Sequence, residues 1–173
     1  DKSIEGTVAS GEIAGDGSLV LKLYYTRNAN TAYTVEYYLQ DLNGTSYTKS
    51  DTYSEEKIGK TGDEVTVTPK AIDGYAFNED AEGNKLTGVI SAEDGKKLVL
   101  KLYYDRNTDT KYTVEYYLQN LAGDGYDKQT PVTELTGKTG APVNAEEKSF
   151  AGFTLDKSIE GTVASGEIAG DGS

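Results

Sequence analysis

Carboxylates are the most plentiful groups in this sequence that could perform acid–base chemistry. Glu36 and Glu115 occupy the same place in two copies of the run Tyr-Thr-Val-Glu-Tyr-Tyr-Leu-Gln. A catalytic pair would need a shared cleft and two differently tuned environments. The chain has no His and no Cys, which removes the commonest general base and the thiolate nucleophile. We therefore expect no enzyme activity and no cofactor, and we place both glutamates on a solvated strand face.

Two acidic loops, residues 78–84 and 169–173, could offer oxygen ligands to calcium. Neither has the alternating ligands and final Glu of the twelve-residue calcium loop. Turn formation by itself accounts for Gly and Asp in such segments. We expect no metal site in either loop.

Tyrosine supplies most of the aromatic surface, with 14 Tyr against 3 Phe. Exposed rings can stack on a sugar or anchor a protein partner. Cross-strand pairing that only stabilises a sheet is the alternative role. The candidate contact residues for a host glycan or protein lie at equivalent positions on the predicted polar strand faces: Tyr24, Tyr38, Tyr103 and Tyr117.

The charge of the chain argues against two classes of partner. The formal net charge is −12, and no basic stripe is present to neutralise phosphates. We therefore expect no nucleic acid and no anionic membrane surface as partner. No apolar stretch approaches the roughly 18 residues that span a bilayer, so we expect no membrane insertion.

Internal repetition is the strongest feature of the sequence. The run Leu-Val-Leu-Lys-Leu-Tyr-Tyr at residues 19–25 returns 79 residues later at 98–104, and residues 33–40 return unchanged at 112–119. This period suits small domains strung as beads. We predict three parts: the end of a preceding repeat (1–28, with a closing strand at 19–25), a complete first unit (29–107), and a second unit without its closing strand (108–173).

The pattern within one unit predicts a mainly β fold. In the repeated run, Leu19, Leu21, Leu23 and Tyr25 alternate with polar or outward-facing positions, which is typical of a half-buried strand. Further strands are expected at 33–40, about 47–57, near 65–68 and at 98–104, with an Asn-Gly hairpin turn at 43–44. We favour tandem β-grasp (ubiquitin-like) units with the last strand beside the first. An immunoglobulin-like sandwich, which expects about seven strands, is the alternative.

These motifs, together with Thr-Gly-Lys-Thr-Gly at 136–140 and Gly-Phe at 152–153, resemble one repeat group. The chain looks like the internalin B-repeats and mucin-binding-protein repeats of cell-wall-attached proteins in Gram-positive bacteria. The resemblance covers essentially the whole chain. It implies a ubiquitin-like β-grasp unit, a place at the bacterial surface or cell wall, and a role in stalks and adhesion.

The two ends of the chain share one sequence, since residues 1–18 are identical to residues 156–173. The chain thus starts and stops at the same phase of the repeat. One explanation is head-to-tail strand exchange into a filament or ring, with Leu19, Leu21, Leu23 and Tyr25 as the assembly strand. The other is a longer array with a superperiod of 155 residues.

The repetition and this resemblance together imply a structural repeat of an extracellular bacterial surface protein. We expect it to act as a stalk, fibre or adhesion spacer whose first partner is another copy of itself. A module that binds mucin or another glycan through its tyrosine face is the alternative.

Overall fold

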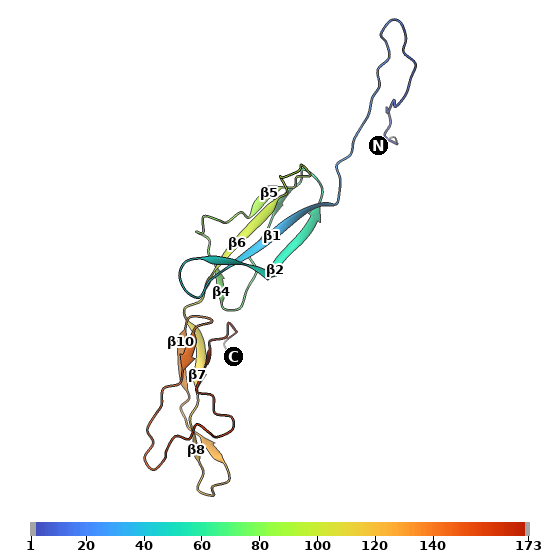
Figure 1. Cartoon of the computed structure of the whole chain (residues 1–173). Coiled ribbons are helices and arrows are strands. Elements are labelled where there is room, and N and C mark those ends of the chain that lie inside the picture. The colour runs from blue at the N-terminus through green and yellow to red at the C-terminus, as the bar shows by residue number, and fades with distance from the viewer. Residues whose placement is uncertain (1–2, 172–173) are drawn as a thin grey trace.

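The computed structural model describes residues 3–171, which contain strands β1 to β12 and no helix. The first unit is built on a four-stranded sheet in the order β2-β1-β6-β4 (Figure 1). Strand β1 (Thr31–Gln40) pairs antiparallel with β2 (Tyr47–Gly59) and parallel with β6 (Val99–Arg106). Strand β4 (Tyr75–Phe77) pairs antiparallel with the other edge of β6. The closing strand of the unit therefore lies beside its first strand, as expected.

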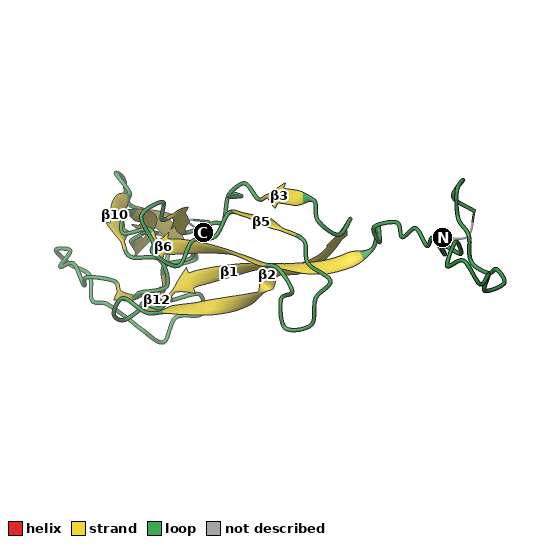
Figure 2. Cartoon of the chain, turned by 90° about the horizontal axis from the view of Figure 1, so that it is seen from above, coloured by secondary structure: helices red, strands yellow, loops and turns green. Residues whose placement is uncertain are grey.

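One face of this sheet carries the core because apolar residues recur at every second position. In β6, Leu100, Leu102 and Tyr104 are buried, and in β1, Val35 and Tyr37 are buried. A small two-stranded sheet, β3 (Glu64–Thr66) with β5 (Thr87–Val89), lies over the same face (Figure 2). The apolar side chains around these two layers form a single cluster.

The hairpin between β1 and β2 follows the predicted turn chemistry. Gly44 has a φ of 91°, which a residue with a Cβ rarely adopts. The Asp41 carboxylate accepts hydrogen bonds from the hydroxyls of Ser46 (2.6 Å) and Thr48 (2.8 Å). Further along, the register shifts between Val35 and Tyr37, which leaves Glu36 at a bulge on the outer face.

The second unit consists of shorter strand pairs. Strand β7 (Thr110–Val114) pairs with β10 (Thr133–Gly137), and β8 (Tyr117–Gln119) pairs with β9 (Tyr126–Lys128). Strand β11 (Pro142–Asn144) pairs with β12 (Ser165–Glu167), in the place that β3 and β5 take in the first unit. Within residues 3–171, no strand pairs with β7 along the edge where β1 receives β6.

Most of the amino-terminal segment, residues 3–28, extends away from both units (Figures 1 and 2), and only its end, at Arg27 and Asn28, contacts the first unit. The strand expected at residues 19–25 is absent from the structure, and its only ladder contact is an isolated bridge between Lys22 and Val8. The prediction was wrong here because a strand needs a neighbouring strand for its backbone hydrogen bonds. In the described chain, no strand of a sheet pairs with this segment.

The assignment to the mainly β class is confirmed. The β-grasp description, the immunoglobulin-like alternative and the unit boundaries stay predictions. The described part of the chain forms no helix, and it therefore contains no membrane-spanning helix.

Candidate functional site

The outer face of the first unit carries a stacked pair of tyrosines. Tyr38 on β1 and Tyr103 on β6 are register partners, and their rings stack with centroids 4.7 Å apart and planes 9° apart. Tyr47 meets the Tyr103 ring edge-on at 5.2 Å. The Lys101 ammonium lies 5.6 Å from the Tyr38 centroid. Two of the four predicted contact tyrosines are therefore brought together by cross-strand pairing.

Glu36 and Tyr38 form the polar part of this face. The Tyr38 hydroxyl donates to Glu36 at 2.8 Å, and the Lys49 ammonium lies 3.2 Å from the other carboxylate oxygen. Burial opposes ionisation of Glu36, but the hydrogen bonds from Tyr38 and Lys49 outweigh it, and the pKa of Glu36 is lowered. The same hydrogen bond to Glu36, with burial, raises the pKa of Tyr38 to about 12. Both groups thus hold one protonation state at neutral pH, which suits binding rather than proton transfer.

The second unit repeats this arrangement without the stack. The Tyr117 hydroxyl donates to Glu115 at 2.6 Å, and Lys128 forms an ion pair with the same carboxylate. Hydrogen bonds from Lys128 and Tyr117 lower the pKa of Glu115, and the bond to Glu115 raises the pKa of Tyr117. Tyr117 is exposed, because no ring from a neighbouring strand covers it. Glu36 and Glu115 lie in different units, so the structure does not bring them together.

A third polar cluster on the outer face was not predicted. Asp105 accepts hydrogen bonds from the Tyr47 hydroxyl and from the Asn78 amide at 2.9 Å. The Asn84 side chain donates to the Asn78 carbonyl at 2.7 Å. Loop 78–84, considered above for calcium, thus uses its asparagines to fold back onto the sheet. Across residues 3–171, no group of three acidic side chains is placed to hold a metal ion.

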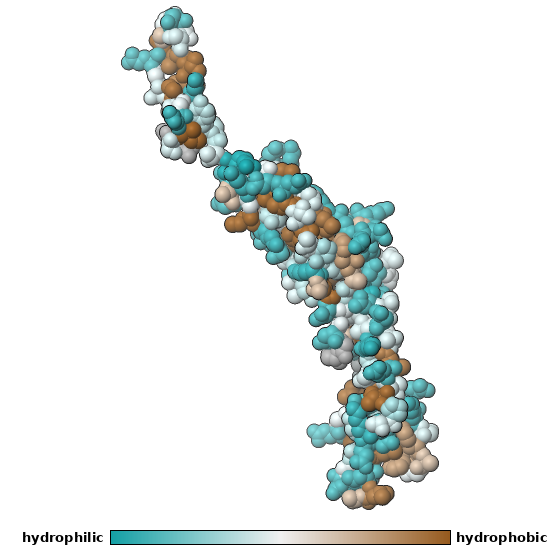
Figure 3. Space-filling view, turned by 180° about the vertical axis from the view of Figure 1, so that it is seen from behind, coloured by the Kyte–Doolittle hydropathy of each residue, from teal (hydrophilic) through white to brown (hydrophobic). Residues whose placement is uncertain are grey.

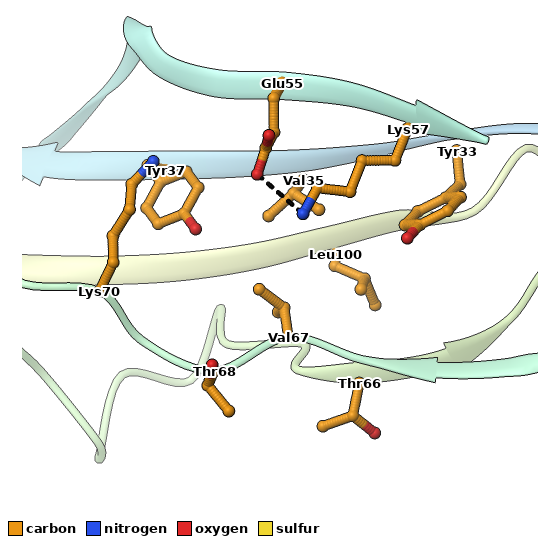
Figure 4. A pocket seen from close by; sticks show the side chains of 10 residues that line it. All are labelled: Tyr33, Val35, Tyr37, Glu55, Lys57, Thr66, Val67, Thr68, Lys70 and Leu100. Atoms are coloured by element: carbon orange, nitrogen blue, oxygen red, sulfur yellow. Dashed lines mark ion pairs between the residues drawn. The ribbon is translucent and has the colours of Figure 1, made fainter. Parts of the chain in front are cut away.

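The core face of the first unit has a hollow of about 300 Å³ between the β1–β2 pair and residues 66–70 (Figure 4). The Lys70 ammonium lies 4.1 Å from the Tyr37 ring centroid and donates to the Tyr53 carbonyl at 3.2 Å. An ion pair between Glu55 and Lys57, with a distance of 3.0 Å, lies beside the hollow. The sequence held no signal for this hollow, because its lining comes from four separate parts of the chain: β1, β2, residues 66–70 and Leu100 of β6.

The repeated run Leu-Val-Leu-Lys-Leu-Tyr-Tyr has two opposite environments in one chain. At residues 98–104 it is a central strand, where Leu102 is 0% and Tyr104 is 1% exposed. At residues 19–25 the equivalent Leu23 is 58% and Tyr25 is 85% exposed. The same local sequence is thus buried within a sheet in one place and left exposed, outside any sheet, in the other.

The second unit leaves exposed several apolar residues whose equivalents are covered in the first unit. Tyr117, Phe153 and Leu155 are exposed there, whereas the equivalent Tyr38, Tyr75 and Phe77 of the first unit are partly buried. Figure 3 shows hydrophobic side chains at the surface of both the amino-terminal segment and the second unit. One chain therefore carries an open strand edge with apolar surroundings and an exposed strand sequence of the kind that fills such an edge.

A comparison with protein-family models finds the MucBP domain twice, at residues 33–105 and 111–172. Searches of curated proteins and of solved structures found no match. MucBP domains are binding and repeat modules of surface-associated proteins, and the resemblance to mucin-binding-protein repeats is confirmed. The two matches account for most of the chain, which therefore belongs to the MucBP domain family and carries two copies of that domain.

Proposed function

We propose that this chain is a stalk segment of a Gram-positive bacterial surface protein and that it assembles end to end by strand complementation. The single observation that carries the proposal is the double environment of the run at residues 19–25 and 98–104. The donor is the amino-terminal segment of one copy, and the acceptor is the edge of β7 in a second copy. The elongated arrangement of the two units supports the role of spacer (Figure 1). We assign no catalytic activity to it.

The pairing in the first unit defines how the donor strand would sit. Residues 20–25 would run parallel to the β7–β8 region, in the register that Val99 to Tyr104 take against Thr34 to Leu39. Tyr24 would then stack on Tyr117 as Tyr103 stacks on Tyr38. Tyr25 would enter the core as Tyr104 does. Burying each large side chain stabilises the pair by roughly 1.5–3 kcal/mol, against the entropy cost of ordering the strand.

Light scattering over a range of concentrations tests this proposal. We expect oligomers that grow with concentration, and we expect the double variant Leu21→Asp/Leu23→Asp to remain monomeric. The matched control is Asn30→Asp, which adds charge outside the strand and copies the residue that the second unit carries at Asp109. A wild-type monomer at every concentration would refute strand complementation.

The tyrosine face supports a second candidate function, the binding of mucin or another glycan. The stacked pair of Tyr38 and Tyr103 lies among charged groups on an outer sheet face, which is a suitable surface for sugar rings and hydroxyls. Binding to immobilised mucin should fall with Tyr103→Ala and be retained with Tyr103→Phe, which keeps the ring. A chain that binds neither mucin nor any arrayed glycan acts as a spacer alone.

A further inference from the structure

The two units are joined by an arginine at the end of the closing strand. The Arg106 guanidinium donates through Nε to the Gln40 carbonyl at 2.8 Å, within the first unit. Through Nη1 it donates to the Thr139 carbonyl of the second unit at 3.1 Å. It also lies 5.1 Å from the centroid of the Tyr75 ring. One side chain therefore contacts both units and lies over an aromatic ring.

Backbone and lysine contacts complete this joint. The Lys138 ammonium donates to the Leu42 carbonyl at 2.8 Å, across 96 residues of sequence. The Thr139 amide donates to the Asn107 carbonyl at 2.9 Å, and the Asn107 amide donates to the Gly74 carbonyl at 2.8 Å. Thr139 is buried, so the joint excludes water at its centre.

The start of the first unit presents half of the same joint. Arg27, the equivalent of Arg106, donates to the Thr61 carbonyl at 3.1 Å and also to the Asp63 carboxylate at 2.7 Å, where the second unit has Ala141. The Thr61 amide donates to the Asn28 carbonyl at 2.9 Å. The Thr31 and Thr61 hydroxyls are 2.6 Å apart, and the equivalent Thr110 and Thr139 hydroxyls are 2.7 Å apart. Lys60, the equivalent of Lys138, is exposed.

The far end of the second unit presents the other half. Leu121 is fully exposed, whereas its equivalent Leu42 is partly buried and accepts the hydrogen bond from Lys138. Phe153 is exposed, whereas its equivalent Tyr75 lies beside the Arg106 guanidinium. The two halves lie at opposite ends of the part formed by the two units, one near the entry of the amino-terminal segment and the other toward the β8 hairpin (Figure 1).

We infer that the start of the first unit docks onto the far end of the second unit of another copy of this chain, by the contacts of the joint inside the chain. The Lys60 ammonium would donate a hydrogen bond to the Leu121 carbonyl. The Arg27 guanidinium would donate one to the Gln119 carbonyl and lie over the Phe153 ring. The inference rests on the proposed strand complementation, because residues 19–25 lead directly into Arg27. Such a contact is heterologous, so it repeats from copy to copy and builds a polar filament unless the rotation closes a ring.

The absence of cysteine makes this docking testable by site-specific crosslinking. The variant Lys60→Cys/Leu121→Cys places thiols on the two half-joints, and a short bis-maleimide should link them between chains. The control variant Lys138→Cys/Leu42→Cys places thiols on the complete joint and should be linked within one chain. Denaturing gels and peptide mass mapping distinguish the two kinds of link.

We expect a ladder of covalent dimers and higher species for the first variant and crosslinked monomer for the control. Concentration-dependent oligomers that give no ladder, while the control is linked, would overturn the docking and leave strand complementation standing. Monomers at every concentration would overturn both, and light scattering on the same samples separates these two results.

Discussion

The hydroxyl of Tyr104 and the backbone of Lys70 form a reciprocal pair, in which the hydroxyl donates to the Lys70 carbonyl and accepts from the Lys70 amide, both at 3.0 Å. This pair ties the central strand β6 to the segment that crosses beneath the sheet. Burial raises the pKa of Tyr104, so the hydroxyl keeps its proton. Through Tyr104, the closing strand therefore adds two hydrogen bonds to its apolar contacts.

Removing the Tyr104 hydroxyl should destabilise the first unit. Tyr104→Phe keeps the ring but leaves the Lys70 amide and carbonyl without this partner, which costs about 1–3 kcal/mol. Urea unfolding monitored by circular dichroism measures the change. Tyr33→Phe is the control, since Tyr33 is a partly buried tyrosine on the same sheet for which the described chain shows no hydroxyl hydrogen bond. Equal losses of unfolding free energy for the two variants would contradict a stabilising role for these two hydrogen bonds.

The same substitution in the two copies of the repeated run should have unequal effects. Leu102→Ala opens a cavity in a closed core and should lower the unfolding free energy by about 2–5 kcal/mol. Leu23→Ala alters an exposed side chain and should change the stability of dilute monomer by less than about 0.5 kcal/mol. Leu23→Ala should instead raise the concentration at which oligomers appear. A large loss of monomer stability for Leu23→Ala would contradict the environment described for residues 19–25.

Acid should weaken the first unit partly through Glu36. Its pKa is lowered from 4.5 in the folded state, so its contribution is present above that value and is lost as the pH falls through the folded pKa. Glu36→Gln should cost on the order of 1 kcal/mol at neutral pH, and the difference from wild type should shrink as the pH falls below 4.5. Unfolding curves measured from neutral to acid pH test this. A stability difference between Glu36→Gln and wild type that is independent of pH would disprove this role of Glu36. Glu12→Gln, in the amino-terminal segment, is the control and should unfold like wild type.

The joint between the units should be sensitive to one added methyl group. A Cβ at Gly170 would lie 2.6 Å from the Asp73 carbonyl oxygen, which is backbone and cannot move aside. Gly170→Ala should therefore loosen the joint and broaden the distance distribution between spin labels in the two units. Gly166→Ala is the matched control, because a Cβ at Gly166 has open space. A distribution unchanged by Gly170→Ala would mean that this contact does not hold the units.

The same contact predicts that the joint between copies is looser than the joint within a chain. The first unit carries Ala92 where the second carries Gly170. Its methyl group would face the carbonyl of Ala151 in the neighbouring copy, the equivalent of Asp73. Ala92→Gly should therefore strengthen end-to-end assembly in light scattering, and unchanged or weaker assembly would count against equivalent docking.

Much of the first unit could be predicted from the sequence because alternation reports directly which strand face is buried. Leu100, Leu102 and Tyr104 are buried and Tyr103 faces outward, as the period of two requires. The repeat, the Asn-Gly hairpin and the equivalence of Tyr38 with Tyr117 can likewise be recognised directly in the sequence. The family match confirms the resemblance that these motifs indicated.

The joint and the outer polar clusters could not be predicted, because they depend on groups far apart in the sequence. Arg106 reaches a carbonyl 33 residues away, and Lys138 reaches one 96 residues away. Neither distance leaves a periodic signal. Asn78 and Asn84 looked like turn residues, and only the folded sheet shows that Asp105 is the partner of Asn78.

The sequence by itself determined the repeat, the β class and the apolar face of each strand, since these follow from local periodicity. The tertiary structure alone decided whether the run Leu-Val-Leu-Lys-Leu-Tyr-Tyr becomes a strand. Residues 98–104 lie between β1 and β4 and pair with both, whereas residues 19–25 have only the bridge to Val8. The physical reason is that a strand is stabilised by backbone groups of its neighbours, and these are supplied by the fold rather than by the run itself.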